Sequence, residues 1–143
     1  MTKFLKRRRD DGGFTLLEML VVLAIMGLLA AIIAPQVLKY LGSSRTQTAK
    51  VQIQNVVAAA ELYRLDVGRY PTQEEGLNAL VAQPSTAAGW NGPYLQKPSA
   101  LDDPWGQPYV YRIPGKHGEI DVYTLGSDKA EGGTGEAADV GNW

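Results

Sequence analysis

A run of 21 residues from Phe14 to Ala34 carries a single charged side chain, Glu18. An α-helix rises about 1.5 Å per residue, so a helix of this length spans roughly 30 Å, the thickness of the hydrocarbon core of a bilayer. The run therefore predicts a membrane-length helix. A carboxylate at that depth costs on the order of 3 kcal/mol, or more without a partner, so we expect Glu18 to meet a cation.

The segment before the apolar run is basic. Residues 1–13 hold five basic and two acidic side chains. By the positive-inside rule, we expect this segment to stay in the cytoplasm while the chain after Pro35 faces outward. The rest of the chain carries 9 basic and 13 acidic residues, and this negative balance gives no indication of nucleic-acid binding.

Three interpretations of the N-terminus are open on these features alone. The apolar run is the hydrophobic region of a cleaved signal peptide, or an uncleaved signal anchor, or the start of the mature chain after a leader that ends before it. A signal peptide is disfavoured because the run is long for a hydrophobic region and Glu18 interrupts it.

The remaining length allows one globular head. Apolar residues make up 45% of the chain, which suffices for a small core in a domain of about one hundred residues. The chain has no cysteine. An exported head without disulfides must be held together by packing or by another device such as a metal ion.

The helical pattern continues beyond Pro35. Apolar side chains between residues 53 and 63 recur at helical spacing, and this stripe is more typical of a helix that seats a head domain than of a partner site. The stripe comprises Ile53, Val56, Val57, Ala60 and Tyr63. Pro35 removes one backbone hydrogen bond, so we expect the helix to kink or melt locally there, with Gly42 as a second soft point. Gly68 is expected to end a helix that runs from Phe14 to about Asp66.

Further patterns predict the rest of the head. Thr72 and Glu75 form a capping-box pattern for a short helix over about residues 73–81, with Leu77, Leu80 and Val81 turned inward. Alternating side chains predict strands at 109–113 and 120–125, and a third short strand has room to join them. These elements predict the α+β class.

Two loop aromatic residues, Trp90 and Tyr94, allow two interpretations. They pin a long connection to the core, which is the commoner case, or they form a binding surface.

The sequence gives little support for an enzyme. The one histidine, His117, lies in a predicted hairpin loop, and there is no cysteine nucleophile. Asp102 and Asp103 are adjacent, so they do not readily share one acid/base site, and Asp103-Pro104 is typical of a turn. No phosphate-binding glycine motif or zinc-ligand spacing is present.

The start of the apolar run resembles the class III leader junction of type IV pilins and pseudopilins. The resemblance lies in the basic leader, the sequence Gly13-Phe14-Thr15-Leu16-Leu17-Glu18, and Pro35 further along. It implies cleavage after Gly13 by a prepilin peptidase, N-methylation of Phe14, and pairing of Glu18 with the N-terminal amine of a neighbouring subunit during assembly. Two charges that are too costly to bury alone become tolerable as such a pair. The implied domains are a leader (1–13), an apolar helix half (14–35) and a head (36–143).

Motifs in the head resemble the major pseudopilins, the G-type subunits, of type II secretion systems. They include Tyr70-Pro71-Thr72, Gly92-Pro93-Tyr94-Leu95, Asp103-Pro104-Trp105-Gly106 and the stretch from Asp121 to Gly126. The resemblance implies a type IV pilin-like fold: a long N-terminal helix, a short helix, a small antiparallel sheet and a C-terminal loop. It also implies a single pass through the inner membrane with the head in the periplasm.

The same resemblance implies a function. The subunit polymerises into a periplasmic pseudopilus that drives the export of folded proteins across the outer membrane. The implied partners are further copies of the chain, minor pseudopilins, the prepilin peptidase, and the inner-membrane assembly platform with its ATPase. The alternative is a signal-anchored periplasmic binding module that never polymerises.

The stretch 126–139 is rich in glycine and acidic residues. By composition it is either a solvated acidic loop, which is the commoner case, or a loop that wraps a hard cation in carboxylate and carbonyl oxygens. The resembled family binds one Ca²⁺ in this loop, which implies Asp128 and the carbonyl of Leu125 as ligands. Glu136 stands where the family generally has aspartate and is a candidate substitute. Asp139 and the carbonyl of Ala130 complete the predicted set.

Overall fold

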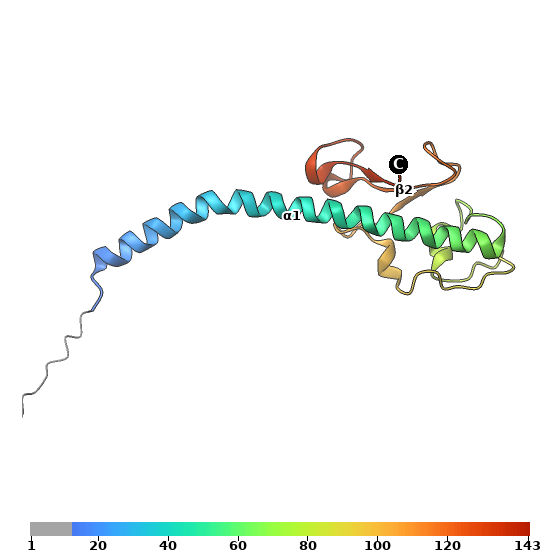
Figure 1. The fold of residues 1–143 in the computed structure, drawn as a ribbon, viewed down its shortest axis with the longest axis horizontal. Coiled ribbons are helices and arrows are strands. Elements are labelled where there is room, and N and C mark those ends of the chain that lie inside the picture. The colour runs from blue at the N-terminus through green and yellow to red at the C-terminus, as the bar shows by residue number, and fades with distance from the viewer. Residues whose placement is uncertain (1–12) are drawn as a thin grey trace, which may run out of the picture. The chain divides into compact units, whose positions relative to one another are not determined.

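The computed structural model describes residues 13–143, so the predicted leader, apart from Gly13, lies outside the described residues. The chain divides into two compact units, the first ending at Leu38 and the second comprising Lys39–Trp143. A single helix, α1 (Leu16–Val67), contributes to both units (Figure 1).

In the first unit, every described side chain is exposed and most are apolar. This part of α1 is long and apolar enough to cross a membrane by length and composition. Helical geometry continues through Pro35, so the local melting expected there is not found in the single chain. A proline removes its own N–H bond, and the bonds of the flanking residues remain to hold the helix together.

The end of α1 agrees with the prediction. The helix begins at Leu16 rather than Phe14 and ends at Val67. Gly68 follows at φ 84°, and its N–H donates to the carbonyl of Arg64 at 2.8 Å. This left-handed conformation suits glycine, which has no Cβ to clash, and it is a common way to close a helix.

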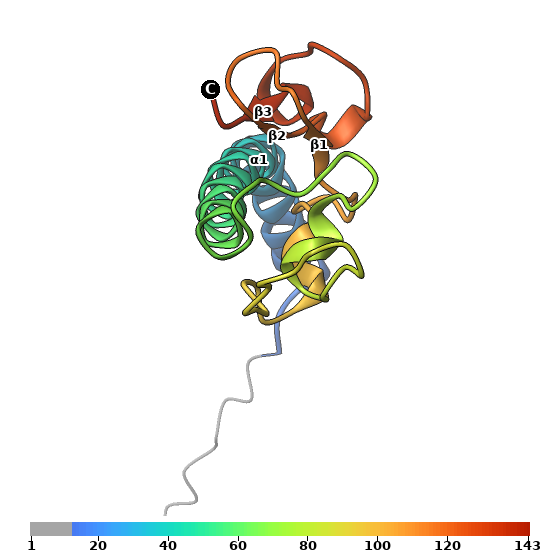
Figure 2. The same cartoon turned by 90° about the vertical axis from the view of Figure 1, so that its right-hand side faces the viewer.

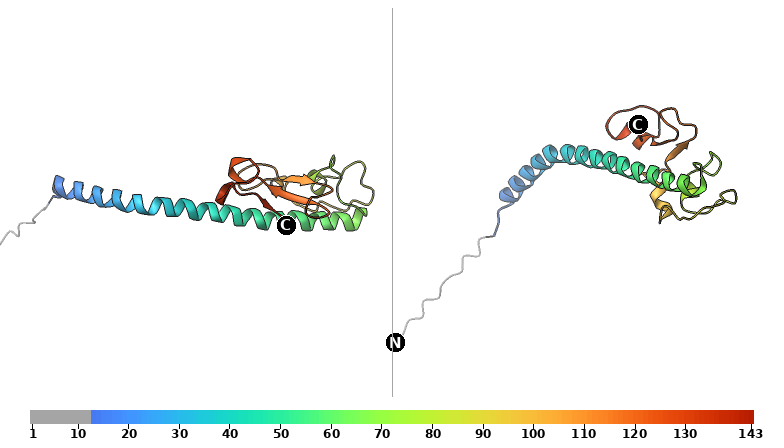
Figure 3. Two further views of the ribbon diagram at one scale, coloured as in Figure 1. Left: turned by 90° about the horizontal axis from the view of Figure 1, so that it is seen from above. Right: turned by 45° about the vertical axis from the view of Figure 1, so that its right-hand side comes forward.

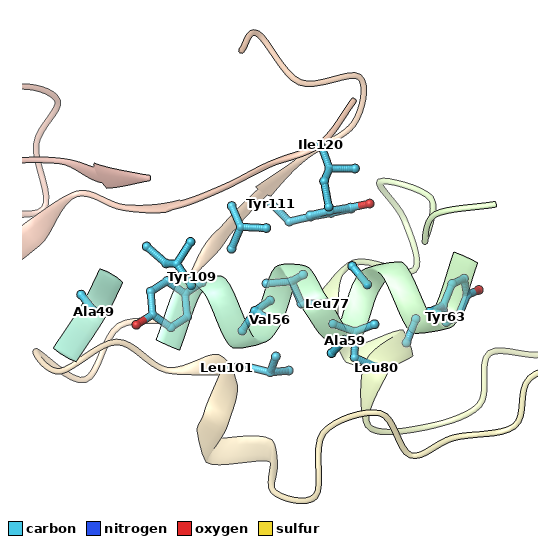
Figure 4. Close-up of a cluster of buried hydrophobic side chains, with 14 of the residues drawn as sticks. Ala49, Val56, Ala59, Tyr63, Leu77, Leu80, Leu101, Tyr109, Tyr111 and Ile120 are labelled. Carbon is cyan, nitrogen blue, oxygen red and sulfur yellow. The ribbon is translucent and has the colours of Figure 1, made fainter. Parts of the chain in front are cut away.

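The core of the second unit forms along one face of α1. The predicted stripe is confirmed: four of its residues are buried and Val57 packs against them. Ala49 and Ala59 extend the stripe. Figure 4 shows several residues of this face, among them Val56 and Ala59, in one cluster with side chains from the rest of the head. The latter include Leu77, Leu80, Leu101, Tyr109, Tyr111 and Ile120.

The predicted short helix over residues 73–81 is shorter and tighter than expected. The capping box is present, because the Thr72 N–H donates to the Glu75 carboxylate at 2.7 Å and the Glu75 N–H donates to Thr72 Oγ1 at 3.2 Å. Gly76 then adopts φ 58°, which interrupts α-helical geometry, and only the 3₁₀ helix η1 (Leu77–Leu80) follows. Leu77 and Leu80 are nevertheless buried as predicted.

A second 3₁₀ helix, η2 (Pro98–Leu101), leads into the sheet. The antiparallel strands are β1 (Val110–Arg112), β2 (Asp121–Thr124) and the short β3 (Val140–Gly141), in the order β1-β2-β3. The first two are shorter than the predicted ranges 109–113 and 120–125. The side chain of Gln73 pairs with the backbone of Tyr111 and Ile113, which covers part of the edge at β1.

The remaining segments of the second unit surround α1 from two sides. The sheet lies along one flank of the helix, and the green-to-yellow segment that contains η1 and η2 lies along another (Figures 1 and 2). Trp90 and Tyr94 belong to the latter segment and pack against the core. The Trp90 indole donates to the carbonyl of Ala79 at 2.8 Å, and Tyr94 contacts Tyr63 edge to face. These contacts support the interpretation that the two aromatic residues pin a connection.

Candidate functional site

The first turn of α1 holds Glu18 through reciprocal hydrogen bonds. Its carboxylate accepts from the N–H of Thr15 at 2.8 Å and from the Thr15 hydroxyl at 3.1 Å, while the Glu18 N–H donates to Thr15 Oγ1 at 3.2 Å. This capping box places the negative charge at the positive end of the helix dipole. Within residues 13–143 of a single chain, the partner of Glu18 is therefore its own helix start, and no described residue supplies the cation expected from the sequence.

The predicted cleavage point lies just before this turn. Gly13 and Phe14 are exposed, Phe14 at 79%, and both precede the first helical residue. A peptide bond outside regular structure is accessible to a peptidase. Cleavage between them and methylation of Phe14 stay predictions.

The C-terminal loop connects β2 to β3 and contains two 3₁₀ turns, η3 (Gly126–Asp128) and η4 (Gly135–Ala137). Asp128 accepts a hydrogen bond from the N–H of Ala130 at 3.1 Å, and Asp139 accepts one from the N–H of Gly132 at 3.0 Å. Both carboxylates are exposed. They order the backbone of the loop while keeping further oxygen lone pairs for a cation.

Glu136 differs from the other predicted ligands. Its carboxylate lies 3.3 Å from the indole nitrogen of Trp105 and 3.7 Å from a guanidinium nitrogen of Arg45 on α1. Asp128, Asp139 and the carbonyl-bearing Leu125 and Ala130 have the oxygen chemistry that Ca²⁺ requires. Within the described residues 13–143, however, no three acidic or histidine side chains gather as a ready metal site.

Sequence reasoning did not find the contact between Glu136 and α1. The one available signal was Gly42, which was interpreted as a soft point in the helix. Gly42 is in fact buried, and a Cβ atom at this position would overlap the side chain of Glu136. A glycine within a helix can mark a close approach by another segment as well as flexibility.

His117 and Asp121 form a further polar group at the end of the hairpin loop. His117 Nδ1 lies 3.2 Å from the Asp121 carboxylate, and the imidazole stacks on Trp143. Although burial acts to raise it, hydrogen bonds from the backbone N–H groups of Lys116 and His117 leave the pKa of Asp121 below its usual value. His117 lies in the hairpin loop as predicted, and its contacts hold that loop against the C-terminal residue.

Asp103 likewise has the turn role that the sequence predicts. Its carboxylate accepts from the backbone N–H groups of Trp105 at 3.0 Å and Gln107 at 2.8 Å, and from the hydroxyl of Thr124 on β2. The turn that carries Trp105 is therefore fastened to the sheet.

Two protein families match the chain, one on each side of the boundary between its apolar run and its head. Residues 8–34 match the prokaryotic N-terminal methylation motif, and residues 36–143 match the family described as type II secretion system (T2SS), protein G. The chain belongs to the protein G family. The resemblance drawn from the motifs of the head is confirmed, and this family consists of structural pseudopilins rather than enzymes.

Individual protein G sequences are similar over almost the whole chain. The type II secretion system core protein G of Pseudomonas aeruginosa is 43% identical over 96% of this chain and 98% of its own length. That of Vibrio cholerae is 42% identical over 97% of this chain and 96% of its own length.

A solved structure supports the fold. The crystal structure of the major pseudopilin from the type 2 secretion system of enterohaemorrhagic Escherichia coli is 31% identical, with a TM-score of 0.60. The alignment covers 70% of this chain and 87% of that one. The predicted α+β pilin-like fold is thus confirmed.

Proposed function

We propose that this chain is the major subunit of a type II secretion pseudopilus, a periplasmic filament that drives the export of folded proteins. One observation carries the proposal: in a member of the protein G family, the start of α1 is apolar on every side and exposed, with Glu18 as the only charge between Phe14 and Ala34. Such a surface requires either lipid or other helices around it.

The apolar surface of α1 serves first to hold the subunit in the membrane and then to pack it in the filament. Before assembly, the apolar part of α1 spans the inner membrane and the head lies in the periplasm. During assembly, apolar helices of many copies pack together in the filament core. An assembly platform with its ATPase, a prepilin peptidase and minor pseudopilins are the partners of this process.

In this scheme, Glu18 sets the axial register between neighbouring subunits. In the single chain its charge is satisfied by Thr15, so the subunit can wait in the membrane. Removal of residues 1–13 creates a free amine on Phe14, and the carboxylate of one subunit then pairs with the amine of a neighbour. The pairing favours one axial stagger because a misplaced pair leaves two charges unpaired in an apolar core.

The test is the assembly of Glu18→Ala in the host that carries the rest of the secretion system. We expect filaments to be lost while the membrane pool of the subunit is unchanged. Glu74→Ala is the matched control, since Glu74 is an exposed carboxylate in the head, and this variant should assemble normally. Intact mass and N-terminal sequencing of the membrane pool should give a chain that starts at N-methylated Phe14. Normal filaments from Glu18→Ala, or a chain that starts at Met1, would overturn the proposal.

We also propose that the loop 125–139 binds one Ca²⁺. Asp128, Asp139 and the carbonyl of Leu125 are the residues that would hold it, with Ala130 as a further carbonyl donor. The support is the chemistry of the oxygen donors and the exposure of both aspartates on one loop. A bound ion would tie this loop together in a chain without disulfides.

A further inference from the structure

η4 contacts α1 at Gly42, a residue that has no side chain. Gly42 is buried, although its neighbours Leu41 and Ser43 on α1 are exposed. A Cβ at Gly42 would overlap Oε1, Cγ and Cδ of Glu136. Figure 3 shows the loop that carries η4, in red, beside α1. Glu136 therefore occupies the notch that the absent side chain leaves in the helix.

The notch is also electrostatically suited to a carboxylate. Glu136 pairs with Arg45, one turn along α1 from Gly42, at 3.7 Å. Lys39 and Lys50 line the same groove of about 390 Å³ together with Gly42 and Glu136. Arg45 is thus the cation that pairs with Glu136, and Lys39 and Lys50 add positive charge to the same groove, which favours the docked arrangement.

A second contact holds Glu136 to another part of the head. The indole N–H of Trp105 donates to its carboxylate at 3.3 Å. Trp105 belongs to the turn that Asp103 fastens to Thr124 on β2. The carboxylate of Glu136 consequently joins three parts of the head: α1, the turn at Trp105 and the C-terminal loop.

η4 also packs directly against η3, the turn that carries Asp128. Gly126, in η3, approaches η4 so closely that a Cβ there would lie 2.5 Å from the carbonyl oxygen of Glu136 and 3.0 Å from that of Ala138. Asp128 ends the same 3₁₀ turn as Gly126. The turn that presents Asp128 is therefore coupled to η4, and a shift of η4 on the helix would also disturb this turn.

We propose that Glu136 is a positioning residue that docks the C-terminal loop on α1, and that it is not a ligand of the Ca²⁺ proposed for this loop. Its carboxylate is held by Trp105 and Arg45, whereas the hydrogen bonds of Asp128 and Asp139 lie within the loop. The second half of the proposal rests on the calcium site, whereas the first half holds in the absence of calcium.

The experiment is hydrogen exchange, by mass spectrometry, of the loop 126–139 in the full chain in detergent micelles, with EGTA and with CaCl₂. In EGTA, Glu136→Ala should speed exchange of the loop about tenfold, the change expected for loss of one charge-assisted hydrogen bond. Glu136→Gln and Arg45→Gln should each have a smaller effect. The double variant should be no worse than Glu136→Gln alone, because both substitutions remove the same ion pair.

Gly42→Ala tests the same contact from the helix side. Alanine favours the helix, so α1 stays intact, and its methyl group displaces the flexible end of Glu136. We expect loop exchange to rise as in Glu136→Ala. Glu131→Gln, which changes an exposed acid of the same loop, is the matched control and should leave exchange unchanged.

Calorimetric titration with CaCl₂ separates the two roles. Asp128→Asn should weaken calcium binding at least tenfold, whereas Arg45→Gln and Glu136→Gln should weaken it similarly to each other and less than Asp128→Asn. The proposal is overturned if Glu136→Gln weakens binding as much as Asp128→Asn while Arg45→Gln has no effect, or if the loop in EGTA exchanges at the same rate in Glu136→Ala and the original chain. If no variant binds calcium, the calcium proposal fails and the EGTA measurements still decide the docking role.

Discussion

Arg69 and Glu75 form a bidentate ion pair beside the core, with two guanidinium nitrogens 2.6 and 2.7 Å from the two carboxylate oxygens. The Glu75 side chain is 8% exposed, and its carboxylate also accepts from the N–H of Thr72 and the hydroxyl of Thr86. The hydrogen bonds from Arg69, followed by those from Thr86 and Thr72, hold the pKa of the Glu75 carboxyl well below its usual range, against the opposing effect of burial. The pair fastens the segment after α1 into one turn.

This ion pair predicts a specific loss of stability in acid. A carboxyl whose pKa is lower in the folded state stabilises the fold fully above its unfolded pKa, about 4.3 for glutamate, and loses this contribution as the pH falls further. We expect Glu75→Gln to reduce the free energy of unfolding by about 2 kcal/mol at pH 7 and by much less near pH 2. Denaturant unfolding of the micelle-bound chain, followed by circular dichroism, measures both values.

The control for this measurement is Glu74→Gln, which changes the exposed neighbouring carboxylate. Other carboxyls with a lowered pKa, such as Asp121, are present in both variants, so the difference isolates Glu75. An equal loss at pH 7 and pH 2 would show that the charge of Glu75 does not contribute.

The two faces of α1 in the head should respond differently to truncation. Ile53 is fully buried, whereas Leu65 is 78% exposed. Removing a buried aliphatic side chain leaves a cavity, so Ile53→Ala should cost about 3 kcal/mol of unfolding free energy. Leu65→Ala should cost less than about 0.5 kcal/mol. Urea unfolding of both variants measures the two values, and equal costs would contradict the burial of this stripe.

The end of α1 should be sensitive to the side chain at position 68. Gly68 has φ 84° with open space around its Cβ position, so a substitution there acts through backbone strain rather than overlap. Gly68→Ala should lower stability by about 1 kcal/mol. Gly68→Asn should cost less, because asparagine tolerates the left-handed region. Thermal unfolding of both variants provides the comparison, and the reverse order of melting temperatures would refute it.

Calcium should stabilise the head if the loop 125–139 binds it. A ligand at one hundred times its dissociation constant contributes about 2.7 kcal/mol, so CaCl₂ should raise the melting temperature of the full chain and EGTA should reverse the rise. Asp128→Asn should abolish most of the shift. Magnesium chloride at equal concentration is the control, because Mg²⁺ gives up its water ligands reluctantly. An unchanged melting temperature in CaCl₂ would remove the calcium proposal.

Local patterns in the sequence predicted much of the fold. The stripe from Ile53 to Tyr63, the stop at Gly68 and the capping box of Thr72 and Glu75 are all confirmed. Each depends on residues within a few positions of one another, so helix periodicity and backbone preference suffice to recognise them. The short helix over residues 73–81 is shorter than predicted because Gly76 adopts a positive φ. Glycine permits this conformation without requiring it, so the tertiary structure decides whether it is adopted.

The features of the candidate site also divide into those that the local sequence predicts and those that depend on tertiary contacts. The junction at Gly13 and Phe14 and the charge of Glu18 are features of adjacent residues and were recognised from the sequence. Glu136 docks beside Gly42, Arg45 and Trp105. Even Trp105, the nearest of these to Glu136 in the sequence, lies more than 30 positions away from it. Sequence spacing carries no information about such a contact, and only the resemblance to the family placed Glu136 in the calcium set.

By itself, the sequence determined that this chain has a membrane-length apolar helix with one carboxylate near its start, followed by an amphipathic stretch that seats an α+β head. These properties follow from hydrophobicity and helical period, which act along the chain. Only the tertiary structure decided which acidic residues of the loop are available and which is already engaged. That choice depends on how η4 packs on α1 and on which cations and N–H groups the fold brings within about 4 Å of each carboxylate.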